Sequence, residues 1–322
     1  MDIKYFSTPI LLIIWRRPNE TFEVINSLRK IKPKKLFISC DGPRLGNREE
    51  AIKVKRTQEI CKEFINWDCE VKWQISKTNL GCKIGVAKAI NWFFNYVQEG
   101  IILEDDNVAH PDFFIFCQNL LEKYRLDKRV WCISGSNNQD NIPRGEGSYY
   151  FGKIPLIWGW ATWKSRWDEY DPDIKDWPYI KSTNMLANIF EDPIEKEYWI
   201  KIWDNFYKNG KPDTWDYSWV LTCLINNALI AIPNENLINN IGFNANATHT
   251  TWEKKSTSII KSIGDKIVHP KILVCDKKAE KYQFDSYFGG YSIRLKKNLI
   301  MRIKNKLKRI LKFKIKLPNH NL

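Results

Sequence analysis

The sequence predicts an α/β protein built on an open, mostly parallel sheet with helices on both faces. Short apolar runs rich in β-branched residues, at 10–15, 36–40 and 101–103, are typical of strands that are buried on both sides. Stretches with helical spacing lie between them, so strands and helices alternate over the first hundred residues. A chain of 322 residues with 43% apolar side chains can bury the core that such a sheet requires.

The elements are expected in a regular order. Residues 10–15 form a strand, and the residues from about 22 to 30 have helical spacing. The first half continues with a strand at 36–40, a helix at 48–64, a strand at 69–75, a helix at 86–97 and a strand at 101–103. The second half contains a helix at 111–124, a strand at 130–133, a helix at 215–227 and a strand at 228–232. Ligands of such sheets bind beyond the carboxyl ends of the strands, so residues that follow the strands are candidate site residues.

The composition excludes some classes of protein. Its 14% of aromatic and 43% of apolar residues exclude a chain that is disordered throughout. The eight cysteines form no C-x-x-C pair, which predicts buried thiols in a reducing compartment. The sequence has no long apolar run and no leader pattern, so we expect neither a spanning helix nor a signal peptide, and a cytoplasmic location.

The net charge of +14 is concentrated in one segment. Residues 291–322 hold eleven Lys or Arg and no acidic residue, which leaves 40 basic and 37 acidic side chains in residues 1–290. Apolar residues recur in this segment at helical spacing, at Leu295, Leu299, Ile303, Leu307, Ile310 and Leu311. This pattern predicts a basic amphipathic helix that binds an anionic membrane surface and holds the protein at the inner face of the membrane. The alternative is a helix packed on the protein's own core.

Three consecutive carboxylates, Glu104, Asp105 and Asp106, follow the buried strand at 101–103. Like charges at this spacing repel one another, and a divalent cation bound together with a diphosphate removes the repulsion. A solvated acidic turn is the competing interpretation, but the position at the end of a buried strand favours a ligand site. We therefore predict a site for a divalent cation and a diphosphate, where the metal neutralises charge on a departing nucleoside diphosphate.

An acceptor hydroxyl also requires a base, and Asp216 in the aromatic stretch 215–219 is the candidate. Aromatic neighbours would desolvate this carboxylate and raise its pKa. The competing interpretation is an Asp that caps the amino end of a helix, which the upstream residues 212–214 also indicate.

Arg16 and Asp41 are further candidates because each lies where a strand is expected to end. Arg16, like the neighbouring Arg17, suits a phosphate or a base edge, with simple solvation as the alternative. Asp41 can accept hydrogen bonds from a nucleobase or ribose, and a turn-forming Asp before glycine is the competing explanation. Among the histidines, His110 and His249 are the candidate metal or phosphate ligands by position.

Several motifs resemble a known enzyme family. Asn79, Gly81 and Gly85, followed by the segment 100–114, resemble the donor-site segment of the eukaryotic N-acetylglucosaminyltransferase family that initiates hybrid and complex N-glycans. They are also similar, more loosely, to bacterial family 2 glycosyltransferases. The resemblance extends over roughly residues 8–250, through the motifs at 130–134, 159–163, 215–219, 241–243 and 248–249.

The resemblance implies a fold of the GT-A type and an inverting enzyme that uses Mn²⁺, or Mg²⁺ in its place, and a UDP-sugar, with UDP-GlcNAc as the candidate donor. Asp106 would bind the metal directly, together with His249. Asp105 would contact the ribose, Glu104 the sugar hydroxyls, and Asp216 would be the catalytic base. Arg16, Asp41, Asn79 and Gly81 match nucleotide-binding positions of the family.

These observations predict four parts of the chain. Residues 1–136 form the nucleotide-sugar-binding half of one GT-A domain, and 137–255 form the half that carries the acceptor site and the base. Residues 256–290 connect this domain to the basic amphipathic segment 291–322.

The function predicted is the metal-dependent transfer of a sugar from a nucleotide-diphospho-sugar to a glycan or lipid-linked acceptor, with no nucleic-acid partner. A metal-dependent nucleotidyltransferase or nuclease would also use clustered carboxylates, an α/β sheet and a basic surface. A binding module that uses the basic segment is the third interpretation, but it leaves the three carboxylates without a role.

Overall fold

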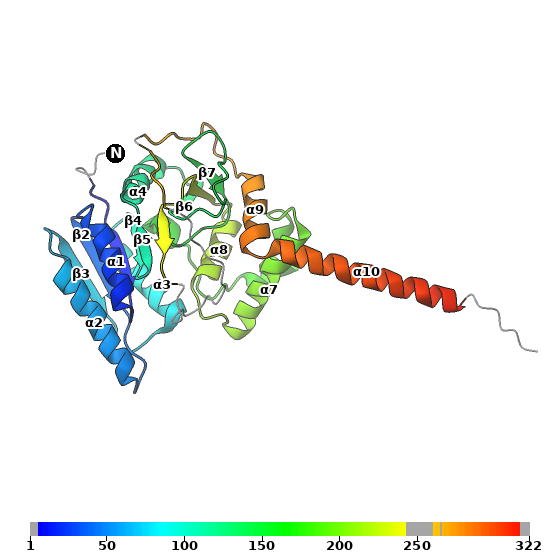
Figure 1. Cartoon of the computed structure of the whole chain (residues 1–322), viewed down its shortest axis with the longest axis horizontal. Coiled ribbons are helices and arrows are strands. Elements are labelled where there is room, and N and C mark those ends of the chain that lie inside the picture. The colour runs from blue at the N-terminus through cyan, green and yellow to red at the C-terminus, as the bar shows by residue number, and fades with distance from the viewer. Residues whose placement is uncertain (1–5, 243–259, 265, 316–322) are drawn as a thin grey trace, which may run out of the picture.

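A single eight-stranded sheet forms the centre of the protein in the computed structural model (Figure 1). The structure describes residues 6–242, 260–264 and 266–315, with 305–315 as backbone only. The strand order is β3-β2-β1-β4-β8-β6-β9-β7. The strands are β1 (Ile10–Ile14), β2 (Lys35–Cys40), β3 (Glu70–Ile75), β4 (Glu99–Glu104), β6 (Val130–Ser134), β7 (Tyr149–Gly152), β8 (Trp160–Trp163) and β9 (Leu229–Pro233).

The first four strands run parallel, and their carboxyl ends meet at one edge of the sheet. In the register, Ile14 of β1 is opposite Cys40 of β2, and Ile13 is opposite Glu104 of β4. Cys40 is in turn opposite Ile75 of β3. The residues that follow these strands are therefore neighbours in space although they are far apart in the sequence.

Helices cover both faces of the sheet, as the alternation within β1 shows. Ile10, Leu12 and Ile14 belong to the core that includes side chains of α1 (Pro18–Arg29), α2 (Arg48–Phe64) and α4 (Pro111–Tyr124). Leu11 belongs to the opposite core, with side chains of α3 (Gly81–Phe94) and α8 (Asp216–Ile225). Because successive side chains of a strand point to opposite faces, β1 is buried on both. The predicted α/β class with an open, mostly parallel sheet is confirmed.

β8 departs from the parallel arrangement. It lies between β4 and β6 and is antiparallel to both, and β7 is antiparallel to β9. A short ribbon of β5 (Asn107–Ala109) and β10 (Ile238–Asn240) lies beside the sheet, with Asn107 opposite Asn240. This ribbon brings residues 240–242 next to the carboxylates that follow β4.

The second half adds a smaller helical layer around a tryptophan-rich core. Trp177, Trp199 and Trp203 are buried there among apolar side chains. The layer consists of α6 (Trp177–Ser182), η2 (Met185–Ala187) and α7 (Pro193–Asn209). Helix α5 (Lys164–Trp167) instead places Trp167 in the core to which Leu11 belongs. Most of the tryptophans are therefore core residues.

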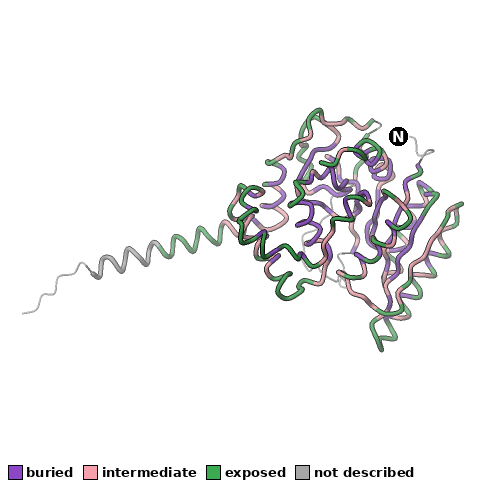
Figure 2. Tube along the Cα trace, turned by 180° about the vertical axis from the view of Figure 1, so that it is seen from behind, coloured by how far each residue is buried: buried purple, intermediate pink, exposed green. Residues whose placement is uncertain are grey.

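The basic segment forms a helix, as expected. After α9 (Lys277–Tyr287), helix α10 (Gly290–Ile315) leaves the body of the protein as a straight rod (Figures 1 and 2). In the described part of the chain, no helix is both long enough and apolar enough to cross a membrane.

Candidate functional site

A cleft of about 610 Å³ lies at the carboxyl ends of the parallel strands. Its walls come from the segments after β1, β2 and β4, from the start of α3, and from the loop before α8. It brings together most of the site residues expected from the sequence: Asp41, Asn79, Gly81, Glu104, Asp105, Asp106 and Asp216.

The three consecutive carboxylates lie at the base of this cleft. Asp105 and Asp106 are buried, and the Arg17 guanidinium lies between them, 3.1 Å from Asp105 Oδ1 and 2.5 Å from Asp106 Oδ2. Asp105 also accepts a hydrogen bond of 3.0 Å from the Trp15 amide, and Asp106 accepts one of 2.7 Å from Asn107. The Glu104 side chain accepts no hydrogen bond from any residue that the structure describes.

Burial and mutual repulsion make these groups hard to ionise. Burial, followed by the charges of Asp106 and Asp105, raises the pKa of Glu104 to about 8. Burial raises the pKa of Asp105 to about 7, although Arg17 acts in the opposite direction. Burial also raises the pKa of Asp106. One arginine thus does not compensate three adjacent carboxylates, and a bound cation would stabilise their charged forms.

The oxygen ligands around Asp106 fit a hard cation that is coordinated only in part by the protein. In the described ranges, no three His, Cys, Asp or Glu side chains converge as a ready metal cluster. Mg²⁺ or Mn²⁺ held by one or two carboxylates completes its coordination with phosphate oxygens and water, so a donor with a diphosphate would supply the rest. His249, the second expected ligand, lies outside the described residues.

Asp41 and Asn79 form the wall of the cleft after β2. Asp41 accepts hydrogen bonds from the Leu80 amide at 3.0 Å and from Asn79 Nδ2 at 2.8 Å. It also accepts one from the Gly42 amide at 2.9 Å, so this carboxylate joins the end of β2 to the loop before α3. Burial raises its pKa.

Arg16 is not among the residues that line the cleft. Its guanidinium is 2.9 Å from Glu50 and lies over the Trp15 ring, 4.4 Å from the centroid. Arg17 and Arg44 line the cleft instead. The sequence pattern indicated Arg17 only as the neighbour of Arg16 and did not predict Arg44, which the loop between β2 and α2 brings to the cleft.

His110, the other candidate histidine, caps α4. Its Nδ1 accepts a hydrogen bond of 3.2 Å from the Asp112 amide.

Asp216 lies on the cleft at the first residue of α8. Trp215 holds the N-cap position without a side-chain hydrogen bond, so the structure does not show Asp216 as a capping residue. The Thr214 hydroxyl donates to Asp216 Oδ1. Trp215 and Trp219 pack against Trp160 in the core, and Trp215 also lines the cleft beside Asp216.

Asp213 is a cleft residue that the sequence did not single out. Its carboxylate accepts hydrogen bonds of 3.3 Å from the amides of Cys82 and Lys83, at the first turn of α3. It therefore joins the loop that carries Asp216 to the loop that carries Asn79. The sequence carries no signal for this contact because the two partners are about 130 residues apart.

We expect Gly81→Ala to weaken nucleotide binding. Gly81 has a φ of +78°, and a Cβ there would lie 2.7 Å from Asp213 Oδ2. The substitution combines a left-handed backbone penalty of about 1–2 kcal/mol with displacement of the Asp213 carboxylate. Thermal unfolding and calorimetric titration with UDP would measure both effects.

Gly46→Ala is the matched control. Gly46 has a φ of +76°, and a Cβ there meets nothing within 4 Å. Both variants should lose similar stability from backbone strain, but only Gly81→Ala should also lose affinity. Equal affinities in the two variants would contradict a positioning role for the contact between Gly81 and Asp213.

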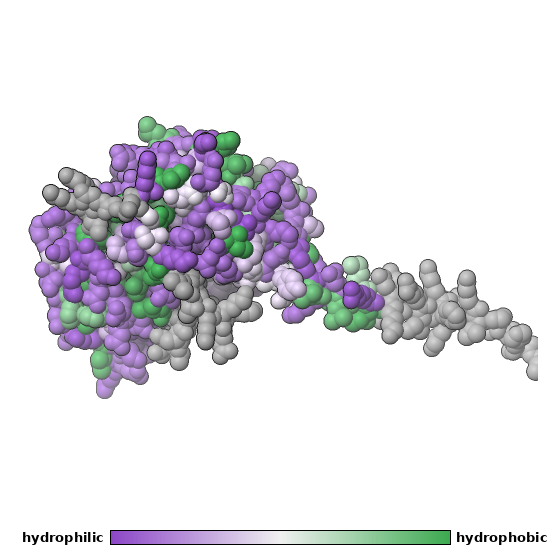
Figure 3. All heavy atoms as spheres, turned by 45° about the horizontal axis from the view of Figure 1, so that its top comes forward, coloured by the Kyte–Doolittle hydropathy of each residue, from purple (hydrophilic) through white to green (hydrophobic). Residues whose placement is uncertain are grey.

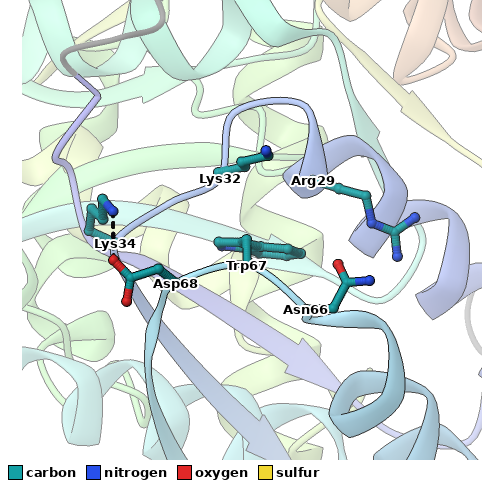
Figure 4. A pocket seen from close by; sticks show the side chains of 6 residues that line it. All are labelled: Arg29, Lys32, Lys34, Asn66, Trp67 and Asp68. Atoms are coloured by element: carbon teal, nitrogen blue, oxygen red, sulfur yellow. Dashed lines mark hydrogen bonds and ion pairs between the residues drawn. The ribbon is translucent and has the colours of Figure 1, made fainter.

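A second, smaller cavity of about 370 Å³ lies at the opposite edge of the sheet. Figure 4 shows its lining, which comes from the residues before β2 and β3. Lys34 pairs there with Asp68 at 2.8 Å, and Trp67 donates to the Pro33 carbonyl. This cavity lies at the amino ends of the strands and contains no cluster of carboxylates, so the larger cleft is the candidate active site.

No family model and no curated protein matches this sequence. The fold, in contrast, is similar to solved structures. A UDP-glucose pyrophosphorylase complexed with UDP-glucose has a TM-score of 0.39 at 11% identity, over 70% of this chain and 90% of that chain. An inositol-1-phosphate CTP transferase from T. maritima has a TM-score of 0.33 at 11% identity, over 71% of this chain and 86% of that chain. HddC from Yersinia pseudotuberculosis has a TM-score of 0.33 at 11% identity, over 51% of this chain and 80% of that chain. Similarities this low assign no reaction to this chain.

Proposed function

We propose that the protein is a metal-dependent glycosyltransferase that takes a sugar from a nucleotide-diphospho-sugar. The observation that carries this proposal is the placement of Glu104, Asp105 and Asp106 at the base of one cleft, with Asp216 in the same cleft. The carboxylate cluster suits a cation with a pyrophosphate, and the separate carboxylate suits an acceptor hydroxyl.

The charged and polar residues expected from the sequence have separate roles in this proposal. Asp106 holds Mn²⁺ or Mg²⁺, which would stabilise negative charge on the departing diphosphate. Asp105 contacts the ribose, and Glu104 accepts hydrogen bonds from sugar hydroxyls. Arg17, which pairs with Asp105 and Asp106 in this structure, would contact the phosphates. Asp41 and Asn79, which line the same cleft, would contact the nucleotide.

The reaction proposed is a displacement with inversion at the sugar carbon. Asp216 takes the proton of the acceptor hydroxyl as that oxygen forms a bond to the anomeric carbon. The bond between the anomeric carbon and the phosphate oxygen breaks, and a nucleoside diphosphate leaves. The donor is a UDP-sugar, with UDP-GlcNAc as the first candidate, and the acceptor is a glycan or lipid-linked saccharide.

Nucleotidyl transfer to a sugar phosphate is the second candidate, and the similar structures include a UDP-glucose pyrophosphorylase and an inositol-1-phosphate CTP transferase. Its nucleophile is a phosphate oxygen that is already charged and needs no base. A carboxylate such as Asp216 beside that nucleophile would repel it. The presence of Asp216 in the cleft therefore favours glycosyl transfer.

Calorimetric titration with a panel of UDP-sugars, with Mn²⁺ or with EDTA, tests the proposal. We expect binding with the metal to be at least about tenfold tighter than without it, as for a ligand that contributes metal coordination. Equal binding in EDTA would contradict the metal role. Release of pyrophosphate from UTP and a sugar phosphate, with no release of UDP from UDP-sugars, would establish the second candidate instead.

A further inference from the structure

Helix α10 is fixed at its base and free along the rest of its described length. Arg294 forms ion pairs with Asp192 at the start of α7 and with Asp285 in α9, and Lys297 pairs with Glu197 in α7. Beyond these contacts the helix extends away from the body, as the tube in Figure 2 shows from behind. The alternative that this helix packs on the protein's own core does not hold for the described residues.

The free part of α10 exposes large apolar side chains. Leu295, Leu299, Ile300 and Ile303 are each 51–59% exposed. Figure 3 shows hydrophobic and hydrophilic side chains next to each other along this stretch. Such an apolar stripe on a protruding helix is unfavourable in water unless another surface covers it.

The same helix carries only positive charge. Between 291 and 322 the sequence has eleven Lys or Arg and no Asp or Glu. The apolar positions recur every three or four residues, and the basic residues fill most of the remaining face. Apolar side chains on one side and cations on the other are the pattern of a helix that lies in a lipid interface.

We propose that α10 binds an anionic lipid surface, with its apolar stripe at the acyl boundary and its Lys and Arg side chains against the headgroups. Charge complementarity distinguishes this partner from a second copy of the chain, since pairing two such helices would bring like charges together. A nucleic acid would use the cations and leave the apolar stripe exposed. The ion pairs of Arg294 and Lys297 join this helix to α7 and α9, so the whole protein would be held at the surface.

Vesicle sedimentation with the full chain tests the proposal. We expect partitioning onto phosphatidylglycerol-containing vesicles to exceed partitioning onto phosphatidylcholine vesicles by about tenfold or more, and to fall as salt rises. The double variant Leu299→Gln with Ile303→Gln should lose about tenfold, because both side chains belong to the apolar stripe. Arg302→Gln with Lys304→Gln should lose binding only to the anionic vesicles.

The matched control is Arg302→Lys with Lys304→Arg, which keeps the charge and should bind like the unmodified chain. Circular dichroism and UDP titration of each variant would establish that the body is folded. Equal binding to both kinds of vesicle, or full binding by the apolar variant, would overturn the proposal. Absence of binding to any vesicle would also overturn it. In that case, a dimer that the apolar variant dissociates would identify a second copy of the chain as the partner, and binding to duplex DNA would identify a nucleic acid.

Discussion

Asp216→Asn is expected to stop sugar transfer while donor binding stays nearly intact. The amide that replaces the carboxylate keeps the shape of the side chain and can still accept from Thr214, but it cannot take a proton from the acceptor hydroxyl. General-base catalysis contributes roughly 10²- to 10⁴-fold, so kcat should fall by that order. Steady-state assays of UDP release, together with calorimetric Kd values for the donor, would separate the two effects.

Asp68→Asn is a suitable control for this variant. The Asp68 side chain is 93% exposed, pairs only with Lys34 among the ion pairs described, and lies far from the cleft at the amino end of β3. It should leave turnover unchanged. Normal turnover in Asp216→Asn would show that the base is another group, and a parallel loss of donor affinity would indicate a structural role for Asp216.

Asp106→Asn is expected to abolish the metal dependence of nucleotide-sugar binding. An amide is a neutral and weaker ligand than a carboxylate for a hard cation. Even the loss of a group that only hydrogen-bonds to a metal ligand costs about 10- to 100-fold in metal affinity. The loss at a direct ligand should be at least as large. Calorimetric titration of UDP with and without Mn²⁺ should give the same weak Kd in this variant.

The pH dependence of unfolding provides an independent readout of the same site. The pKa of Glu104 is raised to about 8 in the folded chain, so the folded chain binds this proton more tightly than the unfolded chain does. The free energy of unfolding therefore falls as the pH rises toward 8. Mn²⁺ with UDP should offset that fall in the unmodified protein, and it should raise the melting temperature more near pH 8 than near pH 6. If Asp106→Asn retained the same metal-dependent increase, the metal would be bound elsewhere.

Local sequence patterns predicted the elements of the parallel half well. Helix α2 has the bounds expected from its spacing, and β1 and β2 differ from expectation by one residue, because uninterrupted apolar runs mark strands that are buried on both faces. The position of the three carboxylates followed from the same pattern, since β4 ends at Glu104. Helix α3 begins at Gly81, before the expected start at 86, because Asp213 caps it from a distant part of the chain.

Contacts between distant segments could not be predicted in the same way. Strand β8 is a short run of aromatic and small residues, and its insertion between β4 and β6 depends on pairing across the whole domain. Arg16 and Arg17 are the same residue type in adjacent positions, and only the backbone direction after β1 decides which one reaches Asp105 and Asp106. Local spacing contains no information on either point.

The pairing of β4 on both of its edges has a mechanical consequence for the carboxylates at its end. β1 holds one edge and β8 holds the other, so the strand cannot swing aside to let Glu104 and its neighbours move apart. Gly242 restricts the space on the far side, where a Cβ would come within 2.1 Å of Asp106 Oδ2. The carboxylates are therefore kept close together, and their repulsion is relieved by proton uptake or by an incoming positive ion rather than by a rearrangement of the backbone.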